Sequence, residues 1–142
     1  AGTVVTIEQL KLAKKYGAEF IVSPDTDEKI IAKTVKLDMV SLPGAYTATE
    51  IKKAHNAGAD YVKLFPCTDN ATSYIKAVKA PLSHIKLLAV GGVDTENIKT
   101  FLKAGACGIG IGSGIIDKKA IETGDFEKIR KLAKNYVEAL SK

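Results

Sequence analysis

The sequence predicts an α/β fold built from parallel strands. Short apolar runs alternate with segments whose apolar residues recur at the 3.6-residue period of an amphipathic helix. The runs lack the polar alternation of a strand with one face in water, so we expect both faces of the sheet to be buried. Strands that alternate with helices pair in parallel through right-handed crossovers, which gives the fold class.

A repeated Gly-Ala pair supports the same class. It occurs at Gly17-Ala18, Gly58-Ala59 and Gly105-Ala106, each time between a helical segment and an apolar run. Glycine readily takes the left-handed conformation that closes a helix. The spacing of about 40 to 50 residues indicates an internal repeat of two strand–helix units.

Taken in order, the pattern predicts six strands and seven helices. The strands are Thr3–Val5, Phe20–Ser23, Met39–Leu42, Tyr61–Phe65, Leu87–Val90 and Gly108–Ile111. The helices are Ile7–Tyr16, Asp27–Lys36, Thr49–Ala57, Ser73–Lys79, Glu96–Ala104, Ile115–Ile121 and a last one from Asp125 to about Leu140. The apolar stripe of this last helix should pack on the core; it consists of Ile129, Leu132, Ala133 and Tyr136.

Capping patterns mark where several helices begin. Thr6-Ile7-Glu8-Gln9 and Thr47-Ala48-Thr49-Glu50 both fit the capping box, in which the threonine hydroxyl and the third following side chain satisfy free backbone N–H groups. Asp25 and Asp94 are positioned to cap in a similar way.

Two architectures fit these elements. A doubly wound, flavodoxin-like sheet suits a chain of 142 residues. A (βα)8 barrel suits the repeat, but typically needs roughly 200 residues or more. The periodicity alone leaves this choice open.

Composition limits the class of protein and its partners. With 46% hydrophobic and 26% charged residues, the chain reads as one globular domain over residues 1–142. No apolar run approaches the roughly 20 residues that span a bilayer, and no signal peptide is present, so we expect a cytoplasmic protein without a membrane partner. The net charge of +5 comes from lysines scattered over helix faces, with Arg130 as the one arginine, which is not the pattern of a nucleic-acid site.

Neither a metal nor a cofactor is expected. Cys67 and Cys107 follow no metal-binding or redox spacing and should be reduced thiols. His55 and His84 lie far apart in the sequence without a cluster of further ligands. The spacing of Gly108, Gly110 and Gly112 differs from the G-x-G-x-x-G pattern, which argues against dinucleotide binding.

Lys63 is the residue that points most directly to chemistry. It lies in the middle of the apolar run Tyr61–Phe65, just before Pro66 ends the strand. Burial lowers the pKa of a lysine and makes its amine a nucleophile near neutral pH. Strand periodicity puts Tyr61, Lys63 and Phe65 on one face, near the carboxyl end where α/β proteins place their sites. The alternative is a lysine of an edge strand whose amine reaches water.

Glycine-rich turns follow the last two strands. Gly91-Gly92 comes directly after Leu87–Val90, and Gly112-Ser113-Gly114 follows Gly108–Ile111. Glycines at such turns let backbone N–H groups approach an anion at a helix N-terminus, so we expect a phosphate site. The other strand ends are also small or polar, namely Ala1-Gly2-Thr3, Ser23-Pro24 and Pro43-Gly44-Ala45, as in the rim of a shared active site.

Together these motifs resemble those of the KDPG/KHG aldolases, which cleave 2-dehydro-3-deoxy-6-phosphogluconate (KDPG) or 4-hydroxy-2-oxoglutarate (KHG). In chain order the motifs are Ala1-Gly2-Thr3-Val4, Ser23-Pro24, Leu42-Pro43-Gly44-Ala45, Val62-Lys63-Leu64-Phe65-Pro66 and Gly91-Gly92-Val93. The resemblance covers essentially the whole chain. It implies a (βα)8 TIM barrel, usually a homotrimer, that forms a Schiff base without a metal and splits a 2-oxo acid into pyruvate and an aldehyde.

The resemblance also implies roles for single residues. Lys63 matches the Schiff-base lysine, Thr3 the threonine that binds the pyruvate carboxylate, and Phe65 the aromatic residue beside the lysine. Gly91, Gly92 and the Gly112-Ser113 turn match the phosphate region, and Pro24 and Gly44 stand at the rim of the substrate site. The resemblance therefore implies that the ligand is a small, phosphorylated 2-oxo acid.

Several positions depart from the family pattern. Ala89-Val90 stands where Pro-Thr is common, Gly112-Ser113-Gly114 where Gly-Gly-Ser is common, and Asp25 where glycine is common. The family's first two βα units would lie upstream of Ala1, with a glutamate that shuttles protons and arginines that hold the carboxylate. We therefore expect an N-terminally incomplete barrel of six βα units that holds the nucleophile, and Glu8 and Glu19 are badly placed to replace that glutamate.

Two rival functions remain. A deoxyribose-phosphate aldolase also carries a strand lysine, but that family has a second lysine before its paired glycines, where this chain reads Leu88-Ala89-Val90. A non-catalytic, phosphate-binding flavodoxin-like module would explain the length and the glycine turns and leave Lys63 unexplained. Its signature would be the strand order of an open, doubly wound sheet.

Overall fold

A computed structural model describes residues 1–68 and 70–141. Strands and helices alternate along this chain. The strands are β1 (Phe20–Val22), β2 (Val40–Leu42), β3 (Gly44–Ala45), β4 (Val62–Leu64), β5 (Leu87–Val90) and β6 (Gly108–Gly110). The helices are α1 (Ile7–Lys15), α2 (Glu28–Lys36), α3 (Ala48–Asn56), α4 (Ala71–Lys79), α5 (Ile98–Ala104), α6 (Lys118–Glu122) and α7 (Phe126–Ser141).

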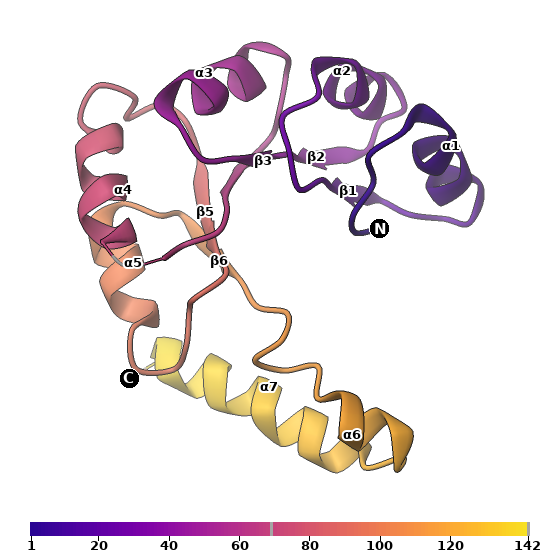
Figure 1. Ribbon diagram of the computed structural model, residues 1–142, viewed down its shortest axis with the longest axis vertical. Coiled ribbons are helices and arrows are strands. Elements are labelled where there is room, and N and C mark those ends of the chain that lie inside the picture. Colours follow the sequence, from indigo (N-terminus) through magenta and orange to yellow (C-terminus); the bar gives the residue numbers. More distant parts are fainter. Residues whose placement is uncertain (69, 142) are drawn as a thin grey trace.

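All strand pairs are parallel, and neighbours in space are neighbours in sequence. One sheet has the order β1-β2 and the other β3-β4-β5-β6. Only Pro43 separates β2 from β3, and its carbonyl accepts a 2.8 Å hydrogen bond from the Lys63 backbone N–H, so the two sheets follow one another. Figure 1 shows α1 to α5 in a row along the outer side of the strands.

This arrangement confirms the α/β class and excludes the doubly wound alternative. A doubly wound sheet reverses its strand order and carries helices on both faces. The consecutive order seen here is the one that barrel strands have. The strands do not close into a barrel, however, because β1 and β6 lie in different sheets and do not pair.

The prediction of an N-terminal strand at Thr3–Val5 is wrong. Thr3 has a φ of 56°, in the left-handed region that breaks an extended strand. Only Gly2 forms a bridge to Val22. The segment still runs beside β1, because the Val22 N–H donates to Ala1 O at 2.8 Å and the Val4 N–H donates to Val22 O at 3.3 Å.

Side-chain caps explain where several helices begin. Both capping boxes are present, at the starts of α1 and α3. Asp27, not Asp25, caps α2. The Asp94 carboxylate binds the N–H groups of Glu96 and Asn97 in a turn, so α5 starts later than expected, at Ile98. Asp117 caps α6, which delays that helix to Lys118.

The core has two parts. The larger one packs strands β3 to β5 against α3, α4 and α5, with Ile51, Leu64 and Ile75 among its buried members. The smaller one joins the N-terminal segment, α1, β1 and α2 through Val4, Leu10, Ile21, Ile30 and Met39.

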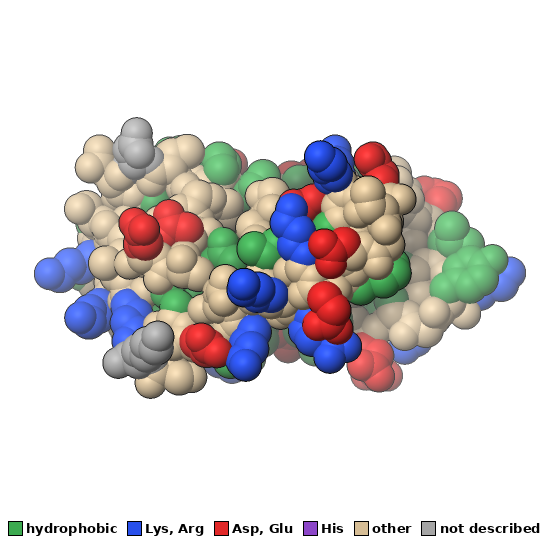
Figure 2. All heavy atoms as spheres, turned by 90° about the horizontal axis from the view of Figure 1, so that it is seen from below, with side chains coloured by type: hydrophobic (Ala, Val, Ile, Leu, Met, Phe, Trp, Pro, Cys, Tyr) green, Lys and Arg blue, Asp and Glu red, His purple; other side chains and the backbone are tan. Residues whose placement is uncertain are grey.

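Helix α7 is only partly buried against the rest of the protein. None of its described residues is fully buried, although Tyr136 and Ala139 pack against the larger core. Figure 1 shows α6 and most of α7 projecting away from the strands. On the face seen in Figure 2, positive and negative side chains are interspersed, with apolar side chains between them. Among the described helices, none has both the length and the apolar character needed to cross a bilayer.

Candidate active site

Lys63 lies at the centre of a fully buried strand. It is 8% exposed, and its neighbours Val62 and Leu64 are each 1% exposed. Strand β4 has β3 on one side and β5 on the other, with Lys63 opposite Gly44 and Leu88. Burial of the amine lowers the pKa of Lys63, and the Asp25 carboxylate partly opposes this by raising it. The strand thus presents an amine that is more readily deprotonated than a surface lysine.

Phe65 lies beside this amine, and Gly91 lies beside the Phe65 ring. The Lys63 Nζ lies 4.5 Å from the centroid of the Phe65 ring, within cation–π range. Gly91 has a φ of 81°, and a Cβ placed on it would lie 3.4 Å from that same ring. The glycine therefore lets the turn after β5 pass close to the aromatic side chain beside Lys63.

Pro24 and Gly44 meet on the opposite side of Lys63. A Cβ on Gly44 would stand 2.1 Å from the Pro24 carbonyl oxygen, so only glycine allows this approach. The Gly44 N–H donates to Asp25 O at 3.1 Å, and the Thr26 Oγ1 donates to Gly44 O at 2.6 Å. These bonds hold the loop after β1 against the strand that pairs with Lys63. The structure therefore brings together five of the expected site residues: Pro24, Gly44, Lys63, Phe65 and Gly91.

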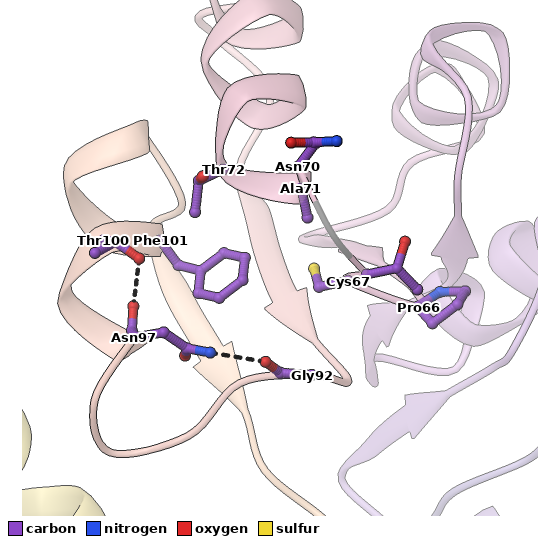
Figure 3. Close-up of a pocket in the computed structure, with 10 residues that line it drawn as sticks. Pro66, Cys67, Asn70, Ala71, Thr72, Gly92, Asn97, Thr100 and Phe101 are labelled. Atoms are coloured by element: carbon purple, nitrogen blue, oxygen red, sulfur yellow. Dashed lines mark hydrogen bonds between the residues drawn. The ribbon is translucent and has the colours of Figure 1, made fainter.

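Gly92 belongs to a neighbouring cavity of about 570 Å3 between the loops that follow β4 and β5. Its φ is 73°, and a Cβ there would lie 2.0 Å from Cys67 O. Figure 3 shows its carbonyl accepting a 2.9 Å hydrogen bond from the Asn97 side chain, while the Phe101 ring and Thr72 face the same space.

Sequence reasoning missed most of the residues that line this cavity. Its polar lining consists of Thr68, Asn70, Thr72, Asn97 and Thr100. The signal was their place in the sequence, since all five lie where a loop meets the first turns of α4 or α5. The influence of the Asp25 charge on Lys63 was also missed, although Asp25 directly follows the Ser23-Pro24 pair at the expected rim of the site.

Thr3, Gly112 and Ser113 lie apart from Lys63. Thr3 is exposed and lines a groove of about 320 Å3 between the N-terminal segment and α1. Gly112 and Ser113 are exposed in the turn after β6, with nothing within 4 Å of a Cβ on Gly112. No hydrogen bond or aromatic contact within residues 1–68 and 70–141 links these three residues to Lys63.

His55 and His84 are neighbours, although they are distant in sequence. Their rings meet edge to face with centroids 5.1 Å apart, because α3 ends close to the turn that precedes β5. In the part of the chain that the structure describes, they have no third His, Cys, Asp or Glu to complete a metal-binding group.

Comparison with known proteins gives one family. The family model "KDPG and KHG aldolase" matches residues 1–132. The 2-dehydro-3-deoxy-6-phosphogalactonate aldolase of Escherichia coli is 41% identical over 116 residues, which cover 81% of this chain and 57% of that protein. The 2-dehydro-3-deoxy-phosphogluconate aldolase of Haemophilus influenzae is 32% identical over 99% of this chain and 66% of its own length.

Solved structures agree in fold. The structure titled "Native KDPGal structure" is 36% identical with a TM-score of 0.86, over 100% of this chain and 69% of that one. A Legionella pneumophila KDPG aldolase, with pyruvate captured as a covalent carbinolamine intermediate, is 25% identical with a TM-score of 0.83, over 96% of this chain and 66% of that one. The chain spans 57% and 66% of the lengths of the two curated relatives named above. It belongs to the KDPG and KHG aldolase family.

Proposed function

We propose that this chain carries the nucleophile of a class I aldolase that cleaves a phosphorylated 2-oxo acid into pyruvate and an aldehyde. The observation that carries the proposal is Lys63, an amine in the middle of β4 that is 8% exposed and whose pKa is lowered by burial. The names of the relatives and the pyruvate carbinolamine in the Legionella enzyme support it. The buried amine of Lys63 and the carbinolamine in the Legionella enzyme favour covalent chemistry at a lysine over simple phosphate binding.

The proposed reaction uses the amine as an electron sink. The unprotonated Nζ of Lys63 attacks the C2 ketone carbon, and the carbinolamine takes a proton on its hydroxyl and loses water to give an iminium ion. The C4 hydroxyl loses its proton to a general base as the C3–C4 bond breaks, and the bonding electrons move into the iminium. The aldehyde leaves, the enamine takes a proton at C3, and water releases pyruvate and the free amine.

The remaining site residues receive proposed binding roles. Phe65 and Gly91 form one wall beside the amine, and Pro24 and Gly44 form the other. Thr3 would bind the carboxylate of the 2-oxo acid, and Gly91, Gly92, Gly112 and Ser113 would bind the phosphate. Thr3 and the Gly112-Ser113 turn lie at the two ends of the strand series, so closure of the sheet into a barrel would bring them to Lys63. We propose that this barrel forms in the complete enzyme, as a homotrimer.

Reductive trapping tests the proposal. The complete protein is incubated with pyruvate and sodium borohydride, and peptides are mapped by mass spectrometry. We expect one reduced pyruvate adduct, located on Lys63. Absence of an adduct on this residue would overturn the Schiff-base proposal.

Turnover assays identify the substrate. The complete protein is assayed with KDPG, with its galactonate epimer and with KHG, and pyruvate release is followed. We expect release from at least one of the three and none of the cleavage of deoxyribose 5-phosphate that a deoxyribose-phosphate aldolase performs. Preference for deoxyribose 5-phosphate would contradict the assignment.

A further inference from the structure

Phe65 places its ring against the amine of Lys63. The Nζ of Lys63 lies over the ring, 4.5 Å from its centroid. Phe65 directly follows β4 and stands two positions after the lysine, so the alternation of an extended chain puts both side chains on one face. The face of an aromatic ring carries negative potential and attracts a cation within about 6 Å of the centroid. The ring is therefore placed to attract any positive charge on this nitrogen.

Backbone hydrogen bonds hold the ring in this place. The Phe65 N–H donates to Ala45 O at 3.1 Å, and the Cys67 N–H donates to Val90 O at 3.0 Å. The chain is thus tied to β3 at Phe65 and to β5 two residues later. A Cβ on Gly91 would lie 3.4 Å from two carbons of the ring, so the turn after β5 also contacts it. The neighbouring strands therefore fix the position of the ring independently of the charge on the amine.

Charged side chains do not take the place of the ring. Within residues 1–68 and 70–141 Lys63 forms no salt bridge, and the flanking strands β3 and β5 carry no ionisable side chain. Burial lowers the pKa of Lys63, and the carboxylate of Asp25, in the loop after β1, partly opposes this. Burial also raises the pKa of the Cys67 thiol, which is therefore uncharged at neutral pH. Among the described residues, the Phe65 ring is the group at contact distance that favours a cation at Nζ.

We propose that Phe65 is a catalytic residue of the Schiff-base site, whose ring face stabilises the positive charge at Nζ of Lys63 in the ammonium and in the iminium ion that replaces it. The inference rests on the proposed function. Its physical basis is that both cations place their charge on the same atom, in a site where Lys63 is 8% exposed and water competes only weakly with the ring. The ring forms no covalent bond and moves no proton.

Fluorination of the ring tests this proposal. Phenylalanine analogues with one, two or five ring fluorines are incorporated at position 65 of the complete protein, because fluorine withdraws electron density from the ring face and changes the shape of the side chain little. The protein is incubated with pyruvate and sodium cyanoborohydride over a range of pH. Mass spectrometry then follows the rate at which the reduced adduct forms on Lys63.

The expected signature differs between the two limbs of the pH profile. On the alkaline plateau the amine starts neutral and becomes a cation, so the rate should fall stepwise with fluorine number, by roughly two- to tenfold over the series. On the acidic limb the ammonium and the iminium lose the same attraction, so the rate should stay unchanged. The midpoint should therefore move to lower pH by roughly a few tenths to one unit. A substitution that only distorts the site would lower both limbs together.

Two simple variants and a matched control complete the test. Phe65→Tyr keeps the ring face and should retain the wild-type profile, whereas Phe65→Leu should lose at least as much of the plateau as the most fluorinated ring. Phe20 provides the control, because it is exposed at the amino end of β1, away from the carboxyl ends of the strands. The same fluorinated analogues at position 20 should leave the profile unchanged.

Two failures can be told apart. If the wild type forms no adduct at any pH, the proposed function and this inference both fall. If the wild type forms the adduct but the fluorinated rings leave the plateau and the midpoint unchanged, or lower both limbs together, the Schiff-base function stands and the charge-stabilising role of Phe65 is wrong.

Discussion

At the scale of single residues, the burial of Lys63 distinguishes the two explanations of a lysine in an apolar strand. The lysine is either a reactive amine or a side chain of an edge strand that reaches water. An edge-strand lysine would reach water with its amine, but β4 has a partner on each side and Lys63 is 8% exposed. A buried ammonium without close pairing destabilises the fold, because it loses hydration that the interior does not replace. A residue kept at such a cost is more consistent with chemistry than with packing.

Replacement of Lys63 should separate function from stability. We expect Lys63→Met to abolish the pyruvate adduct and to leave the melting temperature equal or higher, since an apolar side chain of similar length removes the desolvation penalty. Mass spectrometry and thermal melts of the complete protein check both effects. Lys86→Met is the control, because Lys86 is exposed and lies over the Tyr61 ring, outside the site. A persistent adduct in Lys63→Met would contradict the assignment.

The pH dependence of stability follows from the same burial. An unfolded lysine keeps its proton up to about pH 10.4, whereas burial lowers the pKa of folded Lys63. At pH values between the lowered pKa of folded Lys63 and the pKa of the unfolded residue, the unfolded state binds more protons than the folded state. The free energy of unfolding therefore rises with pH in this range. We therefore expect the stability advantage of Lys63→Met to shrink as the pH rises toward about 10. Guanidinium unfolding curves at several pH values measure this, and a constant difference would count against a buried amine.

Two glycines of the proposed site should respond differently to alanine. A Cβ on Gly44 would collide with the Pro24 carbonyl at 2.1 Å, so Gly44→Ala should destabilise the protein by about 1–3 kcal/mol and displace β3 beside Lys63. Gly112 has open space around it, so Gly112→Ala should change the free energy of unfolding by no more than about 0.5 kcal/mol. Chemical denaturation of the two variants compares them directly, and equal effects would be inconsistent with this geometry.

At the level of elements, the capping box of α3 offers a clean test. The Glu50 N–H donates to Thr47 Oγ1 at 3.3 Å, while the Glu50 carboxylate accepts from the backbone N–H groups of Tyr46 and Thr47. Thr47→Ala should cost about 1 kcal/mol of unfolding free energy. Thr49→Ala, an exposed site within the same helix, should cost nothing, because alanine is the better helix former. Equal losses in denaturation experiments would rule out a specific cap.

Local signals predicted these elements well and their boundaries less well. The capping boxes and the Gly-Ala helix ends depend on hydrogen bonds within a few residues, so they are readable from sequence. The prediction of the N-terminal strand was wrong because Thr3 has a left-handed backbone conformation, which the pattern of hydrophobic residues does not reveal. Likewise, Asp94 and Asn97 cap a turn ahead of α5, and their competition with the helix is visible only in three dimensions.

At the scale of the molecule, the candidate site was predictable where one strand or adjacent strands supply it. Strand periodicity placed Lys63 and Phe65 together, and parallel order brought Gly44 and Gly91 beside them. The positions of Thr3 and Gly112 depend on how the first and last strands approach each other, which is a property of closure and not of any local pattern. The influence of the Asp25 charge on Lys63 was not predictable, because Asp25 follows β1 whereas Lys63 lies in β4.

The open ends of the sheet lead to the last prediction. Strand β6 has a neighbour on one side only, and such an edge exposes backbone groups that favour association. Apolar side chains are also exposed, with Phe126 at 65% and Val137 at 62% on α7, and Leu12 at 54% on α1. Leaving such surface in water forfeits about 25 cal/mol per Å2, against a domain stability of roughly 5–15 kcal/mol.

Residues 1–142 expressed alone should therefore not persist as an active monomer. We expect them to associate through the open edge and the exposed apolar side chains, with low or no turnover of KDPG, because Thr3 and the Gly112-Ser113 turn stay distant from Lys63. Sedimentation velocity, thermal melting and a pyruvate-release assay test this on one preparation. A monodisperse monomer that melts cooperatively and turns over substrate as fast as the complete relatives would show that six strand–helix units suffice for both the fold and the site.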